Sequence, residues 1–284
     1  MPILIICCVV MLLAIGYLFM IVGEQPPKKK AAPFRDLNCA HRGFYTQDQS
    51  IPENTLRAFE RAVEYGYGVE LDVQLTKDGE VVVFHDDTVD RETEYKGRVD
   101  SFTLAELQSM SLFGTQGEKL GIPLFTDVMA VLDGKSPTIV ELKSTENYPE
   151  LCEKTLAILR GCKGPYCVES FDPRIVRWFR EFAPDLMRGQ LSERYSGWRH
   201  SAPPLKAFAM SHFWTNIVTR PHFLAYGSMK KPLGLLLNRA FGVFTVYWTA
   251  EPESDRKRLE SEYDCIIFQF ETPARTYERE EQEK

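Results

Sequence analysis

The 284-residue sequence has no excess of positive charge and none of the glycine-rich loops that bind nucleotides. Its 34 lysines and arginines stand against 40 aspartates and glutamates, which gives a formal net charge of -6. Because nucleic-acid binding needs a basic surface that neutralises phosphates, this balance argues against a nucleic-acid partner. No G-x-G-x-x-G or G-x-x-x-x-G-K-[ST] motif follows any apolar segment, so nucleotide binding by such a loop is disfavoured.

Signatures of serine hydrolases and of zinc sites are also missing. Ser170-Phe171-Asp172 follows an apolar segment, but no G-x-S-x-G motif occurs, and no Cys–His spacing suggests zinc. The seven cysteines include five outside the first apolar run, an odd number that fits a reducing compartment. Those in apolar runs are predicted to be buried small hydrophobes, namely Cys39, Cys167 and Cys265.

Charge is absent from residues 2–23, a run long enough to cross a bilayer core as a transmembrane helix. A secretory signal peptide is the weaker interpretation, because no basic region precedes the run and no small-x-small cleavage site ends it. Residues 24–36 are rich in proline and lysine and are interpreted as a linker. Lys28, Lys29 and Lys30 follow the run closely, so the positive-inside rule predicts a single-pass N-terminal anchor with a cytoplasmic catalytic domain.

After residue 36, short apolar segments alternate with amphipathic ones such as 55–65, 148–159 and 175–182. This alternation over one domain predicts an α/β fold, a TIM (β/α)8 barrel, with an open doubly wound sheet as the second choice. The predicted strands are 37–40, 69–73, 138–142, 166–170, 187–191, 222–226, 244–248 and 265–268.

One segment interrupts the alternation. Asp78-Gly79 lies between two apolar runs and predicts a hairpin, so that residues 81–84 return antiparallel to the second strand and bring His85 near Glu70 and Asp72. Residues 86–123 are too long for an ordinary loop and are predicted to form a small insertion over the barrel mouth. Its apolar residues either contact a small substrate or lipid, or form a satellite core, and the last is favoured for most of them.

Carboxylates gather where the predicted strands end. Glu70 and Asp72 are two residues apart in a strand and therefore point to one face. Two carboxylates on a buried face repel each other unless a proton or cation relieves them. Glu141, near the end of the next barrel strand, completes a cup of three carboxylates that suits one hard divalent cation, Mg²⁺ or Ca²⁺.

Histidines and cations accompany these carboxylates at the strand ends. Arg42 and Lys143 supply positive charge for a phosphoryl group. His41 and His85 flank the phosphorus as general base and general acid, because imidazole titrates near neutral pH. Each residue alone has an ordinary structural explanation, and the conjunction at consecutive strand ends favours a site. The histidines without such neighbours are interpreted as structural or surface residues, namely His200, His212 and His222.

In these segments the sequence resembles the glycerophosphodiester phosphodiesterase family of TIM-barrel enzymes. The segments that carry the resemblance are AHRG (40–43), PENTLRAF (52–59), VELDVQLTKDGEVVVFHDDTVDR (69–91), LGIPLF (120–125) and IVELKS (139–144). Weaker similarity extends it to about residues 37–273, so 37–284 is interpreted as the catalytic domain. The family hydrolyses glycerophosphodiesters to glycerol 3-phosphate and an alcohol, through attack of a glycerol hydroxyl and a cyclic phosphate.

The resemblance implies specific roles. His41 and His85 correspond to the acid–base pair. The metal ligands implied are Glu70, Asp72 and Glu141, and the substrate contacts implied are Arg42, Glu53, Lys143 and Trp248. The sequence departs from the family where Phe268 and Gln269 replace a common Thr-Asp pair, and where Ala250 and Glu251 follow Trp248-Thr249.

These departures leave the alcohol side of the substrate open. A soluble glycerophosphodiester is the first expectation, and a lysophospholipid presented by the membrane lipid bilayer, cleaved by a lysophospholipase D-type reaction, is the alternative. A non-catalytic glycerophosphate-binding module would be expected to lack one of the five histidine and carboxylate positions, and all five are present.

Overall fold

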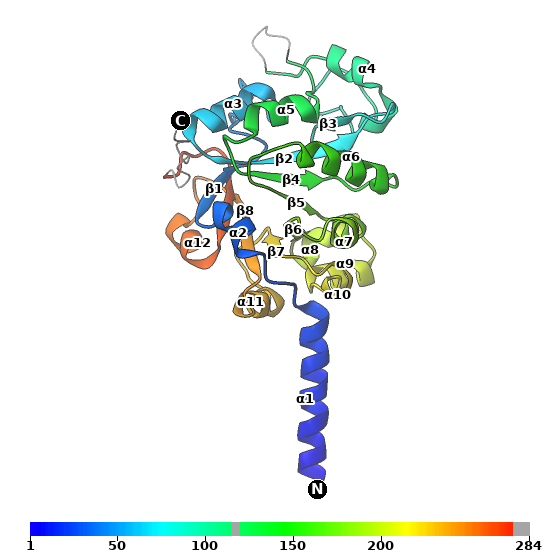
Figure 1. Ribbon diagram of the computed structural model, residues 1–284, viewed down its shortest axis with the longest axis vertical. Helices are drawn as coiled ribbons and strands as arrows, with labels where there is room; N and C mark the ends of the chain where they lie inside the picture. The colour runs from blue at the N-terminus through cyan, green and yellow to red at the C-terminus, as the bar shows by residue number, and fades with distance from the viewer. Residues whose placement is uncertain (115–119, 275–284) are drawn as a thin grey trace.

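The barrel is built from parallel strands. The computed structural model describes residues 1–114 and 120–274. Within them, eight parallel strands close into a barrel with helices around it (Figure 1). The strands are β1 (Leu37–Ala40), β2 (Gly68–Leu75), β4 (Thr138–Leu142), β5 (Tyr166–Ser170), β6 (Arg188–Ser192), β7 (Phe223–Tyr226), β8 (Phe244–Ala250) and β9 (Cys265–Phe268).

The ring closes because β1 pairs with both β2 and β9. Ala40 lies opposite Val69 on one side and opposite Phe268 on the other. An open sheet would leave two edges unpaired, so the second-choice architecture is wrong and the predicted TIM barrel is confirmed. The strands are almost entirely buried, as expected for parallel strands that are covered by helices on their outer face.

The predicted hairpin is also present. β3 (Val81–Val83) runs antiparallel to the end of β2, with Val83 opposite Val73, and Gly79 in the turn has a φ of 79°. Glycine is suited to this position because it adopts a positive φ without a steric penalty. The hairpin therefore extends β2 beyond the barrel and delivers His85 back to the barrel mouth.

Helices cover the barrel and fill its connections. Those that follow the strands are α3 (Leu56–Tyr65), α5 (Phe125–Leu132), α6 (Tyr148–Arg160), α7 (Pro173–Phe182), α8 (Tyr195–Ser201), α9 (Pro204–Ser211), α10 (Asn216–Thr219), α11 (Leu233–Ala240) and α12 (Arg256–Glu262). The three predicted amphipathic segments correspond to α3, α6 and α7. In α3 the Thr55 hydroxyl accepts a hydrogen bond from the Ala58 amide, and Gly66 ends the helix in the left-handed conformation.

Residues 86–123 form the insertion, with the short helices η2 (Val99–Ser101) and α4 (Leu104–Ser109). Residues 115–119 of the insertion lie outside the described residues. The buried side chains of Leu107, Met110 and Leu112 pack with Val82 and Phe84 of the hairpin in a separate cluster. A satellite core is therefore the correct interpretation of these apolar residues, whereas Phe113 is exposed.

A 20-residue apolar helix, α1 (Pro2–Ile21), precedes the barrel and is long and apolar enough to cross a membrane. Figure 1 shows α1 projecting from the barrel. Most of its side chains are exposed, whereas Ile21 at its end is fully buried. The carbonyl oxygen of Ile21 accepts hydrogen bonds from the side-chain amides of Asn216 in α10, at 2.6 Å, and of Asn238 in α11, at 3.0 Å. The end of α1 is thus held between two helices of the barrel domain.

Residues 24–36 also pack on the barrel. They contain α2 (Lys28–Ala31) and η1 (Ala32–Phe34). Glu24 forms an ion pair of 2.7 Å with Arg188, the buried first residue of β6. Phe34 is buried with Phe223 and Phe244 at the amino ends of β7 and β8. This segment therefore differs from the free linker that its composition suggests, because its apolar residues cover the amino-terminal end of the barrel strands.

The cysteines are all free. Cys39, Cys167 and Cys265 are buried in the barrel, as predicted for small hydrophobes. The sulfur atoms of Cys39 and Cys265 are 3.7 Å apart on the paired strands β1 and β9. Their packing role needs no disulfide.

Candidate active site

The carboxyl ends of the strands bring the predicted site residues together. Glu70 and Asp72 lie in β2 and Glu141 lies in the neighbouring β4, where Asp72 and Glu141 are register partners. Partners on adjacent strands point to the same face, so the three carboxylates converge. One oxygen from each lies within 4.8 Å of the others, and all three residues are buried.

This cluster fits a hard divalent cation. It offers three carboxylate oxygens, the ligand type that Mg²⁺ and Ca²⁺ prefer, in a buried cup. Burial, together with the neighbouring Asp72 and Glu141, raises the pKa of Glu70 well above its usual value. Burial and like charges therefore both oppose ionisation of Glu70, and a bound cation would relieve this cost.

Lys143 partly balances the charge of the cluster. Its Nζ atom donates to Glu141 Oε1 at 2.8 Å and to Asp72 Oδ1 at 3.2 Å. Although burial opposes ionisation of Asp72, the Lys143 ammonium, followed by His85 and Arg42, holds the pKa of Asp72 below its usual value. Lys143 therefore lies against the carboxylates that the sequence predicts as metal ligands, rather than apart from them.

Arg42 connects the carboxylate cluster to Glu53. Its backbone N–H donates to Glu70 Oε2 at 3.0 Å, and its guanidinium lies 2.6 Å from Glu53 Oε1 and 3.7 Å from Asp72 Oδ2. The φ of Arg42 is 52°, a left-handed conformation that is uncommon outside glycine. The backbone turn after β1 thus aims both an amide and a guanidinium at the cluster.

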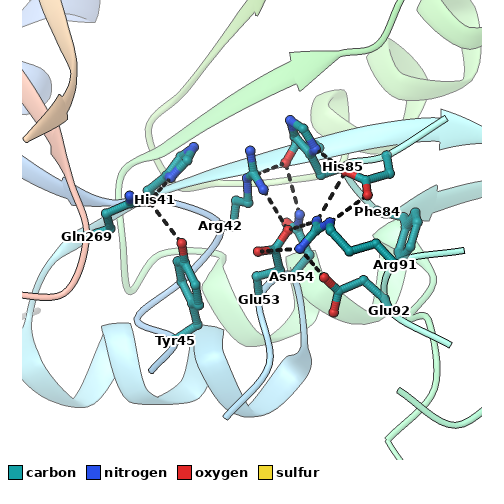
Figure 2. Close-up of polar contacts among 12 residues, drawn as sticks. His41, Arg42, Tyr45, Glu53, Asn54, Phe84, His85, Arg91, Glu92 and Gln269 are labelled. Atoms are coloured by element: carbon teal, nitrogen blue, oxygen red, sulfur yellow. Dashed lines mark hydrogen bonds and ion pairs between the residues drawn. The ribbon is translucent and has the colours of Figure 1, made fainter. Parts of the chain in front are cut away.

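The two histidines have different hydrogen-bond partners. His41 Nδ1 lies 2.8 Å from Oε1 of Gln269, whereas His85 Nδ1 lies 2.6 Å from Oδ1 of Asp86. Figure 2 shows the two imidazoles on either side of the Arg42 side chain. His41 Nε2 faces Glu70 Oε2 at 3.9 Å. Burial and the positive charge of Arg42 lower the pKa of His41 to about 3, so this imidazole is neutral at physiological pH.

The insertion contributes a second arginine. Arg91 lies 2.7 Å from Asp86 Oδ2 and 2.7 Å from Glu53 Oε1, and it also contacts Glu92 (Figure 2). Glu53 is consequently held by Arg42 and Arg91 together, and these two guanidiniums outweigh burial and lower its pKa. The result is a continuous polar network from the end of β1 to the insertion.

Trp248 lies in β8 and packs among aromatic side chains. Its ring stacks edge-to-face on Phe171 at 5.6 Å, and Phe171 packs in the same way on Trp198 of α8 at 5.5 Å. Within the described residues, its buried Nε1 atom has no hydrogen-bond partner. We call these three rings the aromatic wall: Phe171, Trp198 and Trp248.

Several residues of the site escaped the sequence interpretation. The sequence marks Gln269 only as a departure from the family, yet its Oε1 atom accepts hydrogen bonds from His41 and, at 2.9 Å, from the Tyr45 hydroxyl. Asn54, with a φ of 55°, donates to Asp72 Oδ2 at 2.9 Å. Asparagine tolerates this left-handed conformation, and its position inside PENT was the available signal.

Glu169 is a further carboxylate that the sequence interpretation left out. It lies in β5 as the register partner of Glu141 and is buried. Its Oε2 atom has no hydrogen-bond partner among the described residues. Burial, and then the charge of Glu141, raise its pKa well above the usual value.

The remaining histidines and Ser170 are placed as structural residues. His222 is buried against Arg188, and His212 stacks on Phe208 at 4.0 Å. The Ser170 hydroxyl donates to the Leu142 carbonyl at 2.7 Å and is not paired with a histidine. These contacts agree with the absence of a serine-hydrolase motif.

Comparison with known proteins agrees with this arrangement. A glycerophosphodiester phosphodiesterase from Caldanaerobacter subterraneus subsp. tengcongensis is 34% identical over 235 residues, which cover 79% of this chain and 90% of that protein. A glycerophosphodiester phosphodiesterase from Bacillus subtilis is 28% identical over 204 residues, which cover 64% of this chain and 69% of that one.

A solved structure shares the fold. The phosphodiesterase from Oleispira antarctica, in complex with the product sn-glycerol-3-phosphate, superposes with a TM-score of 0.68 at 24% identity, over 84% of this chain and 94% of its own. Residues 41–270 match the glycerophosphoryl diester phosphodiesterase family. This match begins at His41, directly after β1, and includes the other seven barrel strands and every predicted site residue. The chain therefore belongs to the glycerophosphoryl diester phosphodiesterase family and is a phosphoric diester hydrolase.

Proposed function

We propose that this enzyme uses a divalent metal ion, with His41 and His85 as acid–base pair, to release glycerol 3-phosphate and an alcohol from glycerophosphodiesters. The observation that carries the proposal is the pair of differently bonded imidazoles beside one cluster of three carboxylates. The product bound to the Oleispira antarctica relative is the product proposed for this chain.

The hydrogen-bond partners favour a distinct role for each histidine. The neutral amide oxygen of Gln269 accepts the Nδ1 hydrogen of His41, which leaves the Nε2 lone pair free to take a proton. His41 is therefore the general base. Asp86 accepts the Nδ1 hydrogen of His85 and compensates the charge of a doubly protonated ring, so His85 carries a transferable proton on Nε2 and is the general acid.

Glu70, Asp72 and Glu141 would hold the cation, and Asn54 orients Asp72 through its side-chain amide. When bound, the cation supplies Lewis-acid stabilisation of charge on the phosphoryl oxygens. Arg42 and Lys143 add positive charge next to the same cluster and bind the phosphoryl group. Glu53, held by two arginines, accepts hydrogen bonds from glycerol hydroxyls, and Trp248 lines the wall of the substrate pocket.

The reaction then takes two steps. The glycerol hydroxyl oxygen attacks phosphorus while His41 accepts its proton, and the bond from phosphorus to the alcohol oxygen breaks as His85 protonates that oxygen. Water then opens the cyclic phosphate: His85 takes the proton of water, and His41 returns its proton to the glycerol oxygen. Both histidines regain their starting protonation states.

The location of the enzyme is the second part of the proposal. α1 anchors it in a membrane, and Lys28, Lys29 and Lys30 favour a cytoplasmic barrel under the positive-inside rule. The bonds from Asn216 and Asn238 to Ile21 favour a retained anchor over a signal sequence, because cleavage would leave these buried amides unsatisfied. Protease digestion of sealed right-side-out vesicles tests the side; cleavage of the barrel from outside would contradict it.

The aromatic wall favours a second candidate substrate class. Three aromatic rings, in an enzyme held at a membrane, suit the apolar acyl chain that a lysophospholipid carries on its glycerol. A membrane-bound enzyme also meets such lipids at high effective concentration. Release of lysophosphatidic acid from lysophosphatidylcholine in vesicles would distinguish this reaction from the hydrolysis of soluble diesters.

The first experiment uses the full-length protein in detergent, because residues 21–34 pack into the barrel. Release of glycerol 3-phosphate from glycerophosphocholine is measured after EDTA treatment and after Mg²⁺ or Ca²⁺ is restored. Metal-dependent release is the expected result. A protein that is folded by circular dichroism, yet releases neither glycerol 3-phosphate nor lysophosphatidic acid with either metal, would contradict the proposal.

A further inference from the structure

The outer face of α11 is apolar although it is exposed. Leu235 is buried in the hydrophobic core, and Gly234 lies close to Ile21 of α1, where an added Cβ would be 3.7 Å from the Ile21 Cδ1 atom. On the outer face, Leu233 is 63% and Leu236 is 48% exposed. A helix whose outer face contacts water usually carries polar residues on that face. The apolar outer face of α11 therefore indicates contact with an apolar environment.

Exposed apolar residues also occur on α10, the other helix that contacts the end of α1. Ile217 and Val218 of α10 are exposed, and so is Phe241, which follows α11. Both helices contact the end of α1, and Figure 1 shows them at the side of the barrel from which α1 projects. We call these residues the α10–α11 surface: Ile217, Val218, Leu233, Leu236 and Phe241.

The chain segment that contains α10 and α11 carries formal charge of one sign. Residues 194–250 contain seven lysines and arginines and no aspartate or glutamate, whereas the rest of the chain has 27 basic and 40 acidic residues. The net negative charge of the whole protein therefore hides a basic segment that includes α10 and α11. Basic residues beside a membrane span are attracted to anionic lipid headgroups.

Arg220 indicates where such headgroups would lie. Its guanidinium stacks on Phe19 of α1 at 4.4 Å and donates to the carbonyl oxygen of Val22 at 2.7 Å. It thus lies at the end of the apolar helix, between the last residues of the span and the barrel. Lys28, Lys29 and Lys30 are exposed a few residues further along the chain.

We propose that the α10–α11 surface rests in the interfacial layer of an anionic phospholipid bilayer, beside the span. Its apolar side chains enter the boundary between headgroups and acyl chains, while Arg220 and neighbouring basic residues contact lipid phosphates. This inference rests on the proposal that α1 spans a membrane, and it is independent of the proposed catalytic roles.

Photocrosslinking of full-length protein in vesicles tests this surface. 4-Benzoylphenylalanine is introduced in place of Leu236, in place of Leu12 of α1, and in place of Tyr95, which is exposed in the insertion. Each protein is first checked for normal thermal unfolding. The vesicles contain phosphatidylcholine with or without phosphatidylglycerol, and lipid adducts are detected by mass spectrometry after irradiation.

Adducts at positions 236 and 12, but not at 95, are the expected result. Without phosphatidylglycerol the yield at 236 should fall about fivefold or more, the loss expected when one basic residue no longer engages an anionic lipid. Adducts at 12 without adducts at 236 would overturn the surface and leave the span intact. No adducts at either position would overturn both, and equal yields in the two vesicle types would overturn the anionic preference.

Discussion

Oε1 of Gln269 lies 2.8 Å from Nδ1 of His41, across 228 residues of sequence. The Gln269 Nε2 atom donates to Glu251 Oε1 at 2.8 Å, which fixes the orientation of the amide and leaves its oxygen for the imidazole. His41 Nδ1 must therefore be the protonated nitrogen, and Nε2 faces the carboxylate cluster as an acceptor. We infer that Gln269 is a positioning residue that selects the tautomer needed for the proposed general base.

Replacing Gln269 by leucine should lower kcat by about tenfold or more, with little change in KM. The upper limit is the loss of about 10²–10⁴ that is typical when a general acid or base is removed. The leucine keeps the volume but leaves Nδ1 of His41 without its acceptor. Tyr45→Phe is the matched control, because it removes the other donor to the same oxygen. Equal losses in the two variants, measured by steady-state kinetics, would argue against tautomer selection.

His85→Ala should lower turnover by about two to four orders of magnitude, because it removes the proposed general acid. Binding of the metal should persist, since the three carboxylates are untouched. Turnover is measured with glycerophosphocholine, and metal binding is measured by titration calorimetry. Intact turnover would remove His85 from the mechanism.

Addition of Mg²⁺ or Ca²⁺ to metal-free protein should raise Tm, by the equivalent of about 2.7 kcal/mol at a hundredfold excess over Kd. Glu141→Gln should abolish most of this rise because it removes a proposed ligand. Glu169→Gln is the neighbouring control, since Glu169 lies outside the cluster of three. A full thermal response in the Glu141 variant would exclude that residue as a ligand.

Asn238→Ala should lower the free energy of unfolding by about 1–3 kcal/mol, the cost of leaving buried polar groups unsatisfied. The Asn238 amide donates to the Ile21 carbonyl, and its oxygen accepts from the Gly23 N–H at 2.8 Å. Leu236→Ala on the same helix is the control and should change stability in detergent by about 0.5 kcal/mol or less. Similar values for both variants, from denaturant unfolding of the full chain, would contradict a structural junction at Ile21.

Acid should destabilise the protein partly through His222. Burial, and then the charge of Arg188, lower the pKa of His222 to about 4. The unfolded chain therefore takes up a proton before the folded one does, and stability that is present above pH 6.5 is lost as the pH falls towards 4. In EDTA, His222→Gln should show a shallower loss of Tm between pH 7 and pH 5 than the parent. Identical slopes would exclude this residue as a contributor.

The sequence predicted the barrel because parallel strands buried on both faces appear as short apolar runs, and all eight such runs correspond to strands. The hairpin was predictable from Asp78-Gly79, whose turn chemistry is local. Glu70, Asp72 and Glu141 were predictable as a cluster because the carboxyl ends of parallel strands meet at one end of the barrel.

Other contacts depend on side chains that meet only in the folded chain. The bond between Gln269 and His41, and the sharing of Glu53 by Arg42 and Arg91, carry no periodic or local signal. The packing of residues 24–36 was concealed by their composition, because three lysines and three prolines resemble a free linker while Phe34 is a core residue. These contacts were not predictable because their residues are far apart in the sequence, and not because their secondary-structure propensities are weak.

The junction at Ile21 has a mechanical consequence. Since α1 is joined to α10 and α11 by buried hydrogen bonds, a change in the tilt of α1 would rotate the barrel with it. An apolar helix tilts when the bilayer around it becomes thinner, and α1 has the length of an average hydrocarbon core. Bilayer thickness would then set the angle at which the barrel mouth, with its aromatic wall, approaches the lipid surface.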